Sequence, residues 1–279
     1  MYFIYGRKKL MKKRAMAAVS AVMCASMVLS ACGSSASTST TAAPAETKAA
    51  EESKTEETTA AAASGDVVTI NIGFENTTEE PIGQAVEKWA ELLKEESNGT
   101  MELKVFANSA LGNKSKLIDQ MVMGENVITI ADGAFYADYG VPDLGILYGP
   151  FFFDNWDEVW KLIDSDWYKE QCSKLADKGL TVLGSNWVYG ERELMTKDKA
   201  VVPADIKGKK IRLANSQIYV EGFNALGATA VPMALGDVYT ALQNGTLDGV
   251  ENPLSTLYGQ SFQEVTKNIL MTEQITSTP

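Results

Sequence analysis

Two arginines are the residues of this chain whose chemistry stands out. Beyond residue 31 the sequence holds 17 lysines but only Arg192 and Arg212, which lie 20 positions apart. Lysine serves wherever a surface cation suffices, whereas the planar guanidinium grips a carboxylate with two parallel hydrogen bonds. Arg212 also falls in the apolar pattern Ile211-Arg212-Leu213, where an unpaired cation is costly. The two arginines predict either a carboxylate-binding site or two structural ion pairs with acidic side chains.

The composition excludes several kinds of catalytic site. The 279 residues include no histidine, so Ser-His-Asp and Cys-His nucleophiles and His-ligated metals are ruled out. Gly112-Asn113-Lys114-Ser115 has the end of a phosphate-binding loop, but Ala107 replaces its first glycine and Asn113 interrupts the Gly-Lys pair. Carboxylate pairs occur throughout so acidic a chain, and their spacing singles out no acid–base pair. We expect no catalytic residue, no cofactor and no metal.

The charge balance excludes nucleic acid as a partner. The whole chain has 25 Lys and Arg against 36 Asp and Glu, a net charge of −11. The first 31 residues hold six bases and no acid, so removing them leaves 25 − 6 = 19 bases against 36 acids, or −17. So acidic a chain is also repelled by anionic membrane surfaces.

The N-terminus has the pattern of an export signal. A basic segment, Arg7 to Arg14, precedes 17 apolar or small residues, Ala15 to Ala31, which is short for a membrane span. The segment Leu29-Ser30-Ala31-Cys32 is similar to the lipobox of bacterial lipoproteins, which implies cleavage after residue 31 and lipidation of Cys32. Two acyl chains would anchor the chain to a membrane face, outside the cytoplasm. The alternative is an uncleaved anchor helix, and Met11 is an alternative start.

Residues 33–65, after the predicted lipidated Cys32, consist of Ser, Thr, Ala, Glu and Lys with almost no large apolar side chain. Such a composition predicts a disordered stalk, with a regular helix as the alternative.

The folded region is expected from residue 66 onward, as an α/β fold with largely parallel sheets. Apolar runs predict strands at 67–74, 101–106, 127–131, 144–153, 180–185 and 209–213. Apolar residues at helical spacing predict a first helix from Ile82 to about Asn98. The same spacing predicts further helices at 111–123, 155–164, 166–178, 216–227 and 236–244. Strands that alternate with helices in this way are typical of a parallel sheet.

Several segments together resemble one family. Val202-Pro203-Ala204-Asp205-Ile206-Lys207-Gly208-Lys209-Lys210-Ile211-Arg212 resembles the "P-A-D-L-K-G-x-K-I-R" stretch of the solute-binding proteins of tripartite ATP-independent periplasmic (TRAP) transporters. The likeness continues through residues 225–233 and 237–253, which end in Glu251-Asn252-Pro253. Upstream, residues 106–112 and 150–153 are similar to the family's "P-N-S-Q-L-G" and "L-P-F-L-F". The resemblance covers about Val67 to Pro279.

The resemblance implies a two-lobed periplasmic-binding-protein-like fold with a ligand cleft between the lobes, lobe I at 66–189 and lobe II at 190–279. In the family an arginine at the position of Arg212 binds the ligand carboxylate with two hydrogen bonds. Other ligand positions of the family are matched here by Arg192, Asn252, Glu75, Asn76, Asp132 and Leu235, of which Leu235 replaces a usual aromatic residue. Family members continue past the position of Pro279, so the resemblance also implies a C-terminally truncated lobe II.

The function that the resemblance implies is an extracytoplasmic receptor, not an enzyme. A monomer would bind a small organic acid, a sugar acid such as a uronate first and a C4-dicarboxylate second, and deliver it to the membrane subunits of a TRAP transporter. The alternatives are the receptor of an ATP-driven importer, a ligand-sensing subunit, and an exported enzyme acting on acidic sugars.

Overall fold

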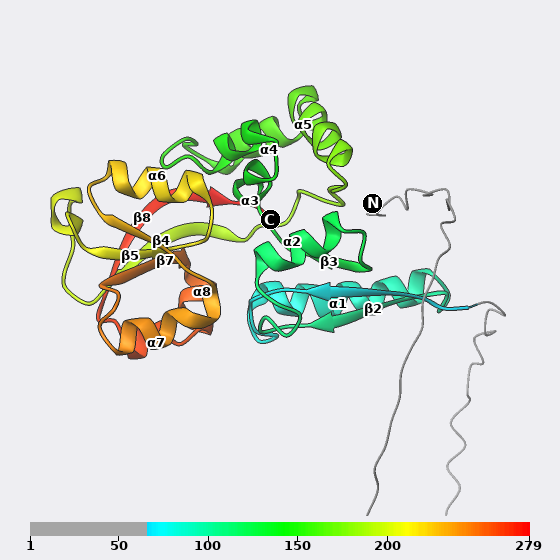
Figure 1. The fold of residues 1–279 in the computed structure, drawn as a ribbon, viewed down its shortest axis with the longest axis horizontal. Coiled ribbons are helices and arrows are strands. Elements are labelled where there is room, and N and C mark those ends of the chain that lie inside the picture. Colours follow the sequence, from blue (N-terminus) through cyan, green and yellow to red (C-terminus); the bar gives the residue numbers. More distant parts are fainter. Residues whose placement is uncertain (1–65) are drawn as a thin grey trace, which may run out of the picture. The chain divides into compact units, whose positions relative to one another are not determined.

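The computed structural model describes residues 66–279, and Figure 1 traces their helices and strands along the chain. The predicted signal segment, Cys32 and the stalk therefore lie outside the described residues. The elements are β1 (Val68–Gly73), α1 (Pro81–Glu96), β2 (Met101–Phe106), α2 (Lys114–Val122), β3 (Val127–Thr129), α3 (Gly133–Asp138), the 3₁₀ helix η1 (Pro142–Tyr148), α4 (Trp156–Ile163), α5 (Asp166–Asp177), β4 (Gly190–Thr196), η2 (Pro203–Ile206), β5 (Lys210–Leu213), α6 (Gln217–Ala225), β6 (Thr229–Pro232), η3 (Leu235–Asp237), α7 (Val238–Gln243), β7 (Gly249–Pro253), α8 (Leu254–Gly259), η4 (Phe262–Glu264) and β8 (Asn268–Ser277).

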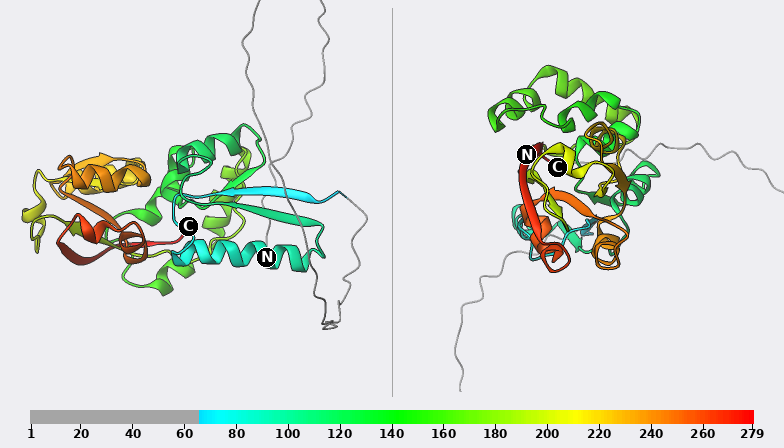
Figure 2. Two further views of the ribbon diagram at one scale, coloured as in Figure 1. Left: turned by 90° about the horizontal axis from the view of Figure 1, so that it is seen from below. Right: turned by 90° about the vertical axis from the view of Figure 1, so that its left-hand side faces the viewer.

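The first sheet has three parallel strands in the order β2-β1-β3. Pro81 stands in the first turn of α1, where a missing backbone N–H leaves no hydrogen bond unmade. The helix buries Ile82, Val86 and Leu93 at helical spacing, and Val86 and Leu93 pack with Ile72 of β1. Figure 2 shows α1 lying along one face of this sheet.

The second sheet has five strands in the order β6-β5-β7-β4-β8. β5 pairs in parallel with β6 and β7, as the alternation of strands and helices predicts. β4 runs antiparallel to both of its neighbours, β7 and β8. The fold is therefore α/β with parallel sheets, apart from the pairings of β4.

Two predicted strands are absent from the described chain. The apolar run 144–153 begins inside η1 instead, and 180–185 has no regular structure. Pro142 stands in the first turn of η1, and a Cβ added at Gly145 would lie 3.2 Å from the Cβ of Ala137, so η1 packs closely on α3. A short apolar run is buried equally well as strand or helix, and its pattern does not distinguish them.

Buried apolar side chains form three clusters. One lies between α1 and the first sheet, and one packs α7 against the second sheet around Val250. The largest includes Leu144 of η1, Leu194 of β4 and Tyr219 of α6, so it combines residues from both sides of position 190. Within residues 66–279, no helix is long and apolar enough to cross a membrane.

Candidate functional site

Strand β5 places Arg212 inside the protein, with 2% of its surface exposed. Its Nε and Nη2 donate to the carbonyl oxygen of Met233 at 2.9 and 2.7 Å. Nη1 is buried and, among the described residues, has no hydrogen-bond partner. Burial lowers the pKa of Arg212, and the charges of Glu75 and Glu251 oppose this effect. An unpaired buried N–H of a cation is costly, so this position favours an anionic acceptor.

Arg212 lines a cavity of about 160 Å³. Its polar walls come from four segments: Glu75 after β1, Asn113-Lys114-Ser115 at the start of α2, Arg212 itself, and Asn215 before α6. Glu75 is the single acid among the lining residues, and Lys114 lies 4.7 Å over the ring of Phe135. The walls thus offer two cations, one carboxylate, two amides and one hydroxyl.

A second cavity, of about 440 Å³, shares Ser115, Phe135 and Asn215 with the first. Its further lining includes Asp138 of α3 and Gln217 at the start of α6, whose backbone N–H donates to Asp138 Oδ2 at 3.2 Å. The two cavities therefore adjoin at these three shared residues.

Arg192 is held by an acidic partner. Its Nε and Nη2 donate to the two carboxylate oxygens of Glu251 at 2.6 and 2.8 Å, and its guanidinium lies 5.0 Å from the ring centre of Tyr219. Burial, the largest single effect, lowers the pKa of Arg192, but the charge and hydrogen bonds of Glu251 together with the nearby Tyr219 and Asp132 raise it overall. The sequence predicted either a carboxylate-binding site or structural ion pairs for the two arginines. Arg192 forms such an ion pair.

The two arginines lie on opposite faces of the second sheet. Arg192 pairs in register with Pro253 of β7, whereas Arg212 pairs with Val250. Side chains alternate along a strand, so positions 250 and 253 point to opposite faces. By the same alternation Asn252, which is buried, shares the face of Arg212. A ligand contact of Arg192 stays a prediction.

Asp132 and Asn76 are both buried, in separate hydrogen-bonded groups. Asp132 Oδ2 accepts from the hydroxyl of Tyr219 at 2.9 Å, and its Oδ1 is without a partner in the described chain. The amide of Asn76 donates to Glu80 at 2.7 Å and to the hydroxyl of Tyr189 at 2.9 Å. Neither residue lines the cavity beside Arg212.

Leu235 is also placed away from that cavity wall. It is buried among the apolar side chains around α7. Its backbone N–H donates to Glu75 Oε1 at 3.4 Å, so it contacts a lining residue but is not one itself. Of the seven predicted ligand residues, the structure brings Arg212 and Glu75 to one cavity.

Sequence reasoning missed three polar residues that line the cavity together with Arg212. Asn113, Lys114 and Ser115 line the cavity, although their motif was rejected as a phosphate loop. Asn113 caps α2 by accepting the N–H of Lys116 at 3.0 Å, which fixes the turn that carries Lys114 and Ser115. The polar cluster was visible in the sequence, but its proximity to Arg212 was not.

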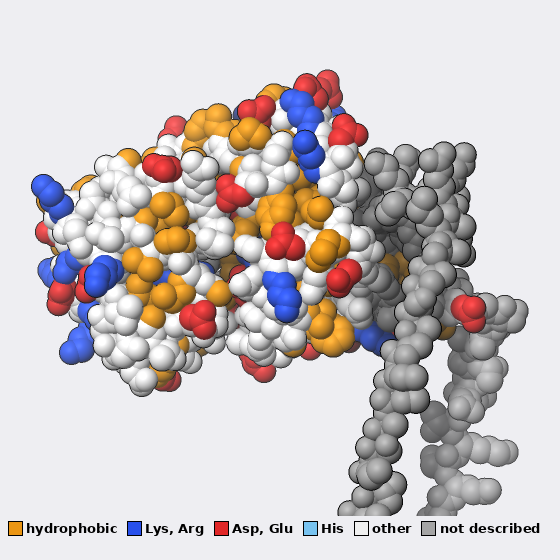
Figure 3. All heavy atoms as spheres, viewed as in Figure 1, with side chains coloured by type: hydrophobic (Ala, Val, Ile, Leu, Met, Phe, Trp, Pro, Cys, Tyr) orange, Lys and Arg blue, Asp and Glu red, His pale blue; other side chains and the backbone are white. Residues whose placement is uncertain are grey.

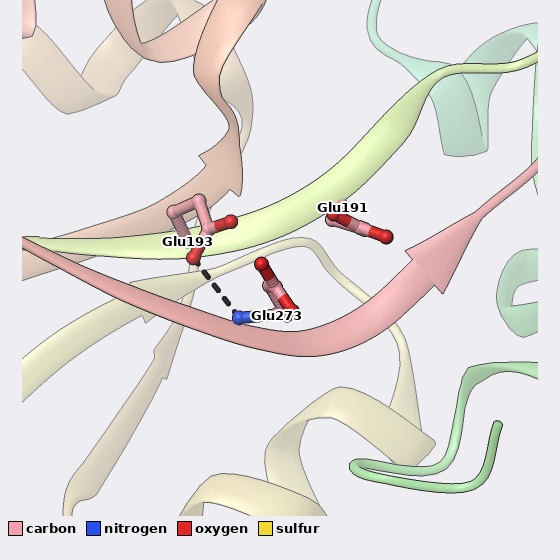
Figure 4. Close-up of side chains that lie close together, drawn as sticks. All are labelled: Glu191, Glu193 and Glu273. Carbon is pink, nitrogen blue, oxygen red and sulfur yellow. Dashed lines mark hydrogen bonds between the residues drawn. The ribbon is translucent and has the colours of Figure 1, made fainter. Parts of the chain in front are cut away.

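Three carboxylates gather where β4 and β8 pair irregularly, as Figure 4 shows. Glu191, Glu193 and Glu273 each bring an oxygen within 4.8 Å of the others. Glu193 accepts the backbone N–H groups of Thr272 and Glu273, which explains its burial. On the face shown in Figure 3, acidic and basic side chains are interspersed.

A larger cavity, of about 570 Å³, lies elsewhere in residues 66–279. It is mostly apolar and is lined by Trp89, Tyr168 and Trp187 together with the last residues, Thr278 and Pro279. Neither Arg192 nor Arg212 lines it.

Comparison with known proteins places the chain in a family. Residues 72–278 match the family described as bacterial extracellular solute-binding protein, family 7. The chain is 32% identical over 206 residues to the 2,3-diketo-L-gulonate-binding periplasmic protein YiaO of Escherichia coli, covering 73% of this chain and 62% of that protein. It is 31% identical over 188 residues to the C4-dicarboxylate-binding periplasmic protein DctP of Rhodobacter capsulatus, covering 67% and 56%. The chain thus spans about 60% of the length of such curated relatives.

Solved structures agree with this assignment. A TRAP periplasmic solute-binding protein from Ochrobacterium anthropi with bound L-fuconate is 40% identical, with a TM-score of 0.74 over 76% of this chain and 70% of that chain. A second, from Actinobacillus succinogenes with bound L-galactonate, is 36% identical with a TM-score of 0.74 and the same coverage. The α/β fold described above is therefore that of TRAP periplasmic solute-binding proteins. This chain belongs to the bacterial extracellular solute-binding proteins of family 7.

Proposed function

We propose that this chain is the ligand-binding part of an extracytoplasmic TRAP receptor and binds a small sugar acid whose carboxylate pairs with Arg212. The observation that carries this proposal is the buried guanidinium of Arg212 with an unpaired Nη1 beside a polar cavity. The family and the sugar acids bound to the similar structures support it.

The hydrogen bonds of Arg212 leave one edge of the guanidinium free for a ligand. A guanidinium has five N–H bonds, and Met233 accepts the Nε–H and one Nη2–H. The second Nη2–H and both Nη1–H bonds remain, and the Nη2–H with the parallel Nη1–H forms the planar fork that matches a carboxylate. The Met233 carbonyl thereby fixes the orientation of that fork before the ligand arrives.

The other lining residues favour hydroxyl groups over a second carboxylate. Glu75 accepts hydrogen bonds but repels another anion, whereas Asn113 and Asn215 can donate to or accept from hydroxyl groups. Lys114 adds one cation at the far wall. A polyhydroxylated monocarboxylate satisfies these groups better than a C4-dicarboxylate does.

Receptor action needs two lobes that close on the ligand. We assign residues 66–189 to lobe I and 190–279 to lobe II, so that Glu75 and Lys114 approach Arg212 from across the cleft. A ligand drives closure only if its contacts are stronger in the closed state, and contacts from both lobes meet that condition. The loaded receptor would act as a monomer, anchored through lipidated Cys32, and would pass the acid to TRAP membrane subunits.

A ligand panel tests the proposal. We expect L-fuconate, L-galactonate and galacturonate to raise the melting temperature, since a ligand at 100 times its Kd stabilises the folded state by about 2.7 kcal/mol. Galactitol, which lacks the carboxylate, is the matched control and should cause no shift. Succinate should cause a smaller shift than the sugar acids. Equal shifts in Arg212→Ala and wild-type protein would place the site elsewhere.

A further inference from the structure

Glu80 carries a buried carboxylate that the proposed site does not use. It is 2% exposed and stands directly before α1, where a side chain normally accepts the first N–H groups of the helix. The side chain makes no such bond, and it has no ion pair with any described lysine or arginine. A buried charge that neither caps its helix nor meets a cation needs another stabilising set of contacts.

Four hydrogen-bond donors surround this carboxylate. Oε1 accepts from the backbone N–H of Thr77 at 3.1 Å and from Gln260 Nε2 at 2.9 Å. Oε2 accepts from Asn76 Nδ2 at 2.7 Å and from Thr256 Oγ1 at 2.9 Å. Four donors fill the acceptor capacity of an ionised carboxylate. Two of them belong to the loop after β1, and two belong to α8 and its end, about 180 positions away.

Tyr189, directly before β4, completes the network. Its hydroxyl accepts from Asn76 at 2.9 Å and lies 2.7 Å from Thr256 Oγ1. Burial raises the pKa of Tyr189 to about 12, so the hydroxyl keeps its proton near neutral pH. Because Thr256 donates to Glu80, Tyr189 donates to Thr256. The network therefore joins the loop after β1, the start of β4 and α8.

The close approach of α8 to Glu80 requires a glycine. A Cβ added at Gly259 would lie 2.4 Å from Glu80 Cγ. The same loop carries Glu75, which lines the cavity of Arg212 and accepts the N–H of Leu235. The position of Glu75 beside the cavity thus depends on how the loop is fastened to α8.

We propose that Glu80 is a positioning residue for the ligand cleft: it fastens loop 75–80 to α8 and thereby sets where Glu75 stands and how closely the two lobes approach. The effect on ligand affinity rests on the proposed function, whereas the attachment of loop 75–80 to α8 through Glu80 does not. The two are measured separately.

Hydrogen–deuterium exchange of the full chain without ligand tests the fastening. Glu80→Gln keeps the size of the side chain but puts an amide donor where two donors already point. We expect exchange to be about fivefold faster or more in both 75–80 and 254–260, and unchanged in β5, since one lost hydrogen bond weakens a contact by about 1 kcal/mol. Exchange that changes only in 75–80, or not at all, overturns the proposal.

Swapping the two partners separates positioning from local damage. In Glu80→Gln combined with Gln260→Glu, donor and acceptor trade places, and we expect exchange in 254–260 to return to the wild-type rate. If Glu80→Gln does not fold, Thr256→Val with Thr256→Ser as its matched control makes the same test, because only the serine keeps the hydroxyl. Equal exchange rates in Thr256→Val and Thr256→Ser would also overturn the proposal.

The probe for affinity is L-galactonate. We expect Glu80→Gln to bind it about tenfold more weakly, through faster dissociation, and the swapped pair to recover. If Arg212→Ala binds like the wild type while Glu80→Gln speeds exchange in α8, the proposed function fails and the fastening stands. If Arg212→Ala loses binding while Glu80→Gln changes neither quantity, the fastening fails alone.

Discussion

At the scale of single residues, Arg192 and Arg212 show that equal burial does not mean equal roles. Both are 2% exposed. Arg192 has a carboxylate partner in Glu251, whereas the hydrogen bonds of Arg212 go to a backbone carbonyl. The charge of Arg192 is thus balanced by Glu251, whereas Nη1 of Arg212 is buried without an acceptor among the described residues. Substitutions should therefore affect folding at one position and binding at the other.

For Arg212 we expect a loss of binding in a folded protein. Arg212→Lys keeps the charge but loses the planar fork, and should weaken sugar-acid binding at least about tenfold because a charged hydrogen bond contributes about 1.5–3 kcal/mol. Arg212→Ala should weaken it by about two to three orders of magnitude. Asn252→Ala, on the same face, should have a smaller effect. Calorimetric titration measures each affinity, and wild-type affinity in a folded Arg212→Ala protein would contradict the clamp.

For Arg192 we expect a loss of stability. Removing one partner of a buried ion pair leaves an uncompensated charge, which costs about 3–5 kcal/mol. Arg192→Met should therefore lower the free energy of unfolding strongly, because Glu251 is fully buried. The double variant Arg192→Met with Glu251→Leu should recover much of that loss. Urea unfolding measures both, and a stable single variant with weak ligand binding would instead support the predicted ligand contact.

At the scale of elements, backbone packing positions the loop that carries Glu75. Gly83 of α1 lies so close to the loop that an added Cβ would be 2.1 Å from the Thr77 carbonyl oxygen. The turn between β1 and α1 is therefore fixed by a glycine in the helix as well as by Glu80. A side chain at position 83 would displace α1 or the loop.

Gly83→Ala should destabilise the protein, although alanine is the better helix former. Overpacking of this kind costs about 1–3 kcal/mol, more than the helix propensity gained. Gly236→Ala is the matched control, because a Cβ there meets nothing within 4 Å and its φ is not positive. We expect Gly236→Ala to be neutral within about 0.5 kcal/mol. Thermal unfolding of both variants checks the prediction, and equal melting temperatures would refute it.

At the scale of the whole molecule, the charge balance bears on membrane attachment. Without its first 31 residues the chain has a net charge of −17, from 19 bases and 36 acids. So acidic a protein gains no electrostatic attraction from an anionic membrane surface. We therefore expect membrane attachment of the mature chain to come from the predicted lipidation of Cys32.

Cys32→Ser should therefore release the protein completely from the membrane fraction, or leave it as an uncleaved precursor. The wild-type N-terminal peptide should carry the mass of its acyl chains, and the serine variant should not. Cell fractionation and peptide mass spectrometry measure the two quantities, with Cys172→Ser as the control that keeps the anchor. Membrane retention of both variants, with no acyl mass on the wild type, would contradict lipidation.

Much of the fold was determined by local sequence. The strands β1, β2 and β5 and helices α1, α2, α4, α5 and α6 match their predicted segments within a few residues, because each repeats apolar side chains at its own period. The family followed from long motifs such as 237–253, and the comparisons confirm it. Arg212 stood out by its rarity as an arginine and by its apolar neighbours, and the family resemblance made it the predicted ligand arginine.

Only the tertiary structure decided the rest. The direction of β4 and the strands β6, β7 and β8 depend on pairing with distant segments, and no local period encodes that. The separation of Arg192 from Arg212 follows from the register of both with β7, where positions 253 and 250 face opposite ways. The wall made by Asn113 to Ser115, and the four donors around Glu80, come together through contacts between residues as much as 180 positions apart. Sequence patterns report which side chains are buried, but which of them meet is set by the packing of whole elements.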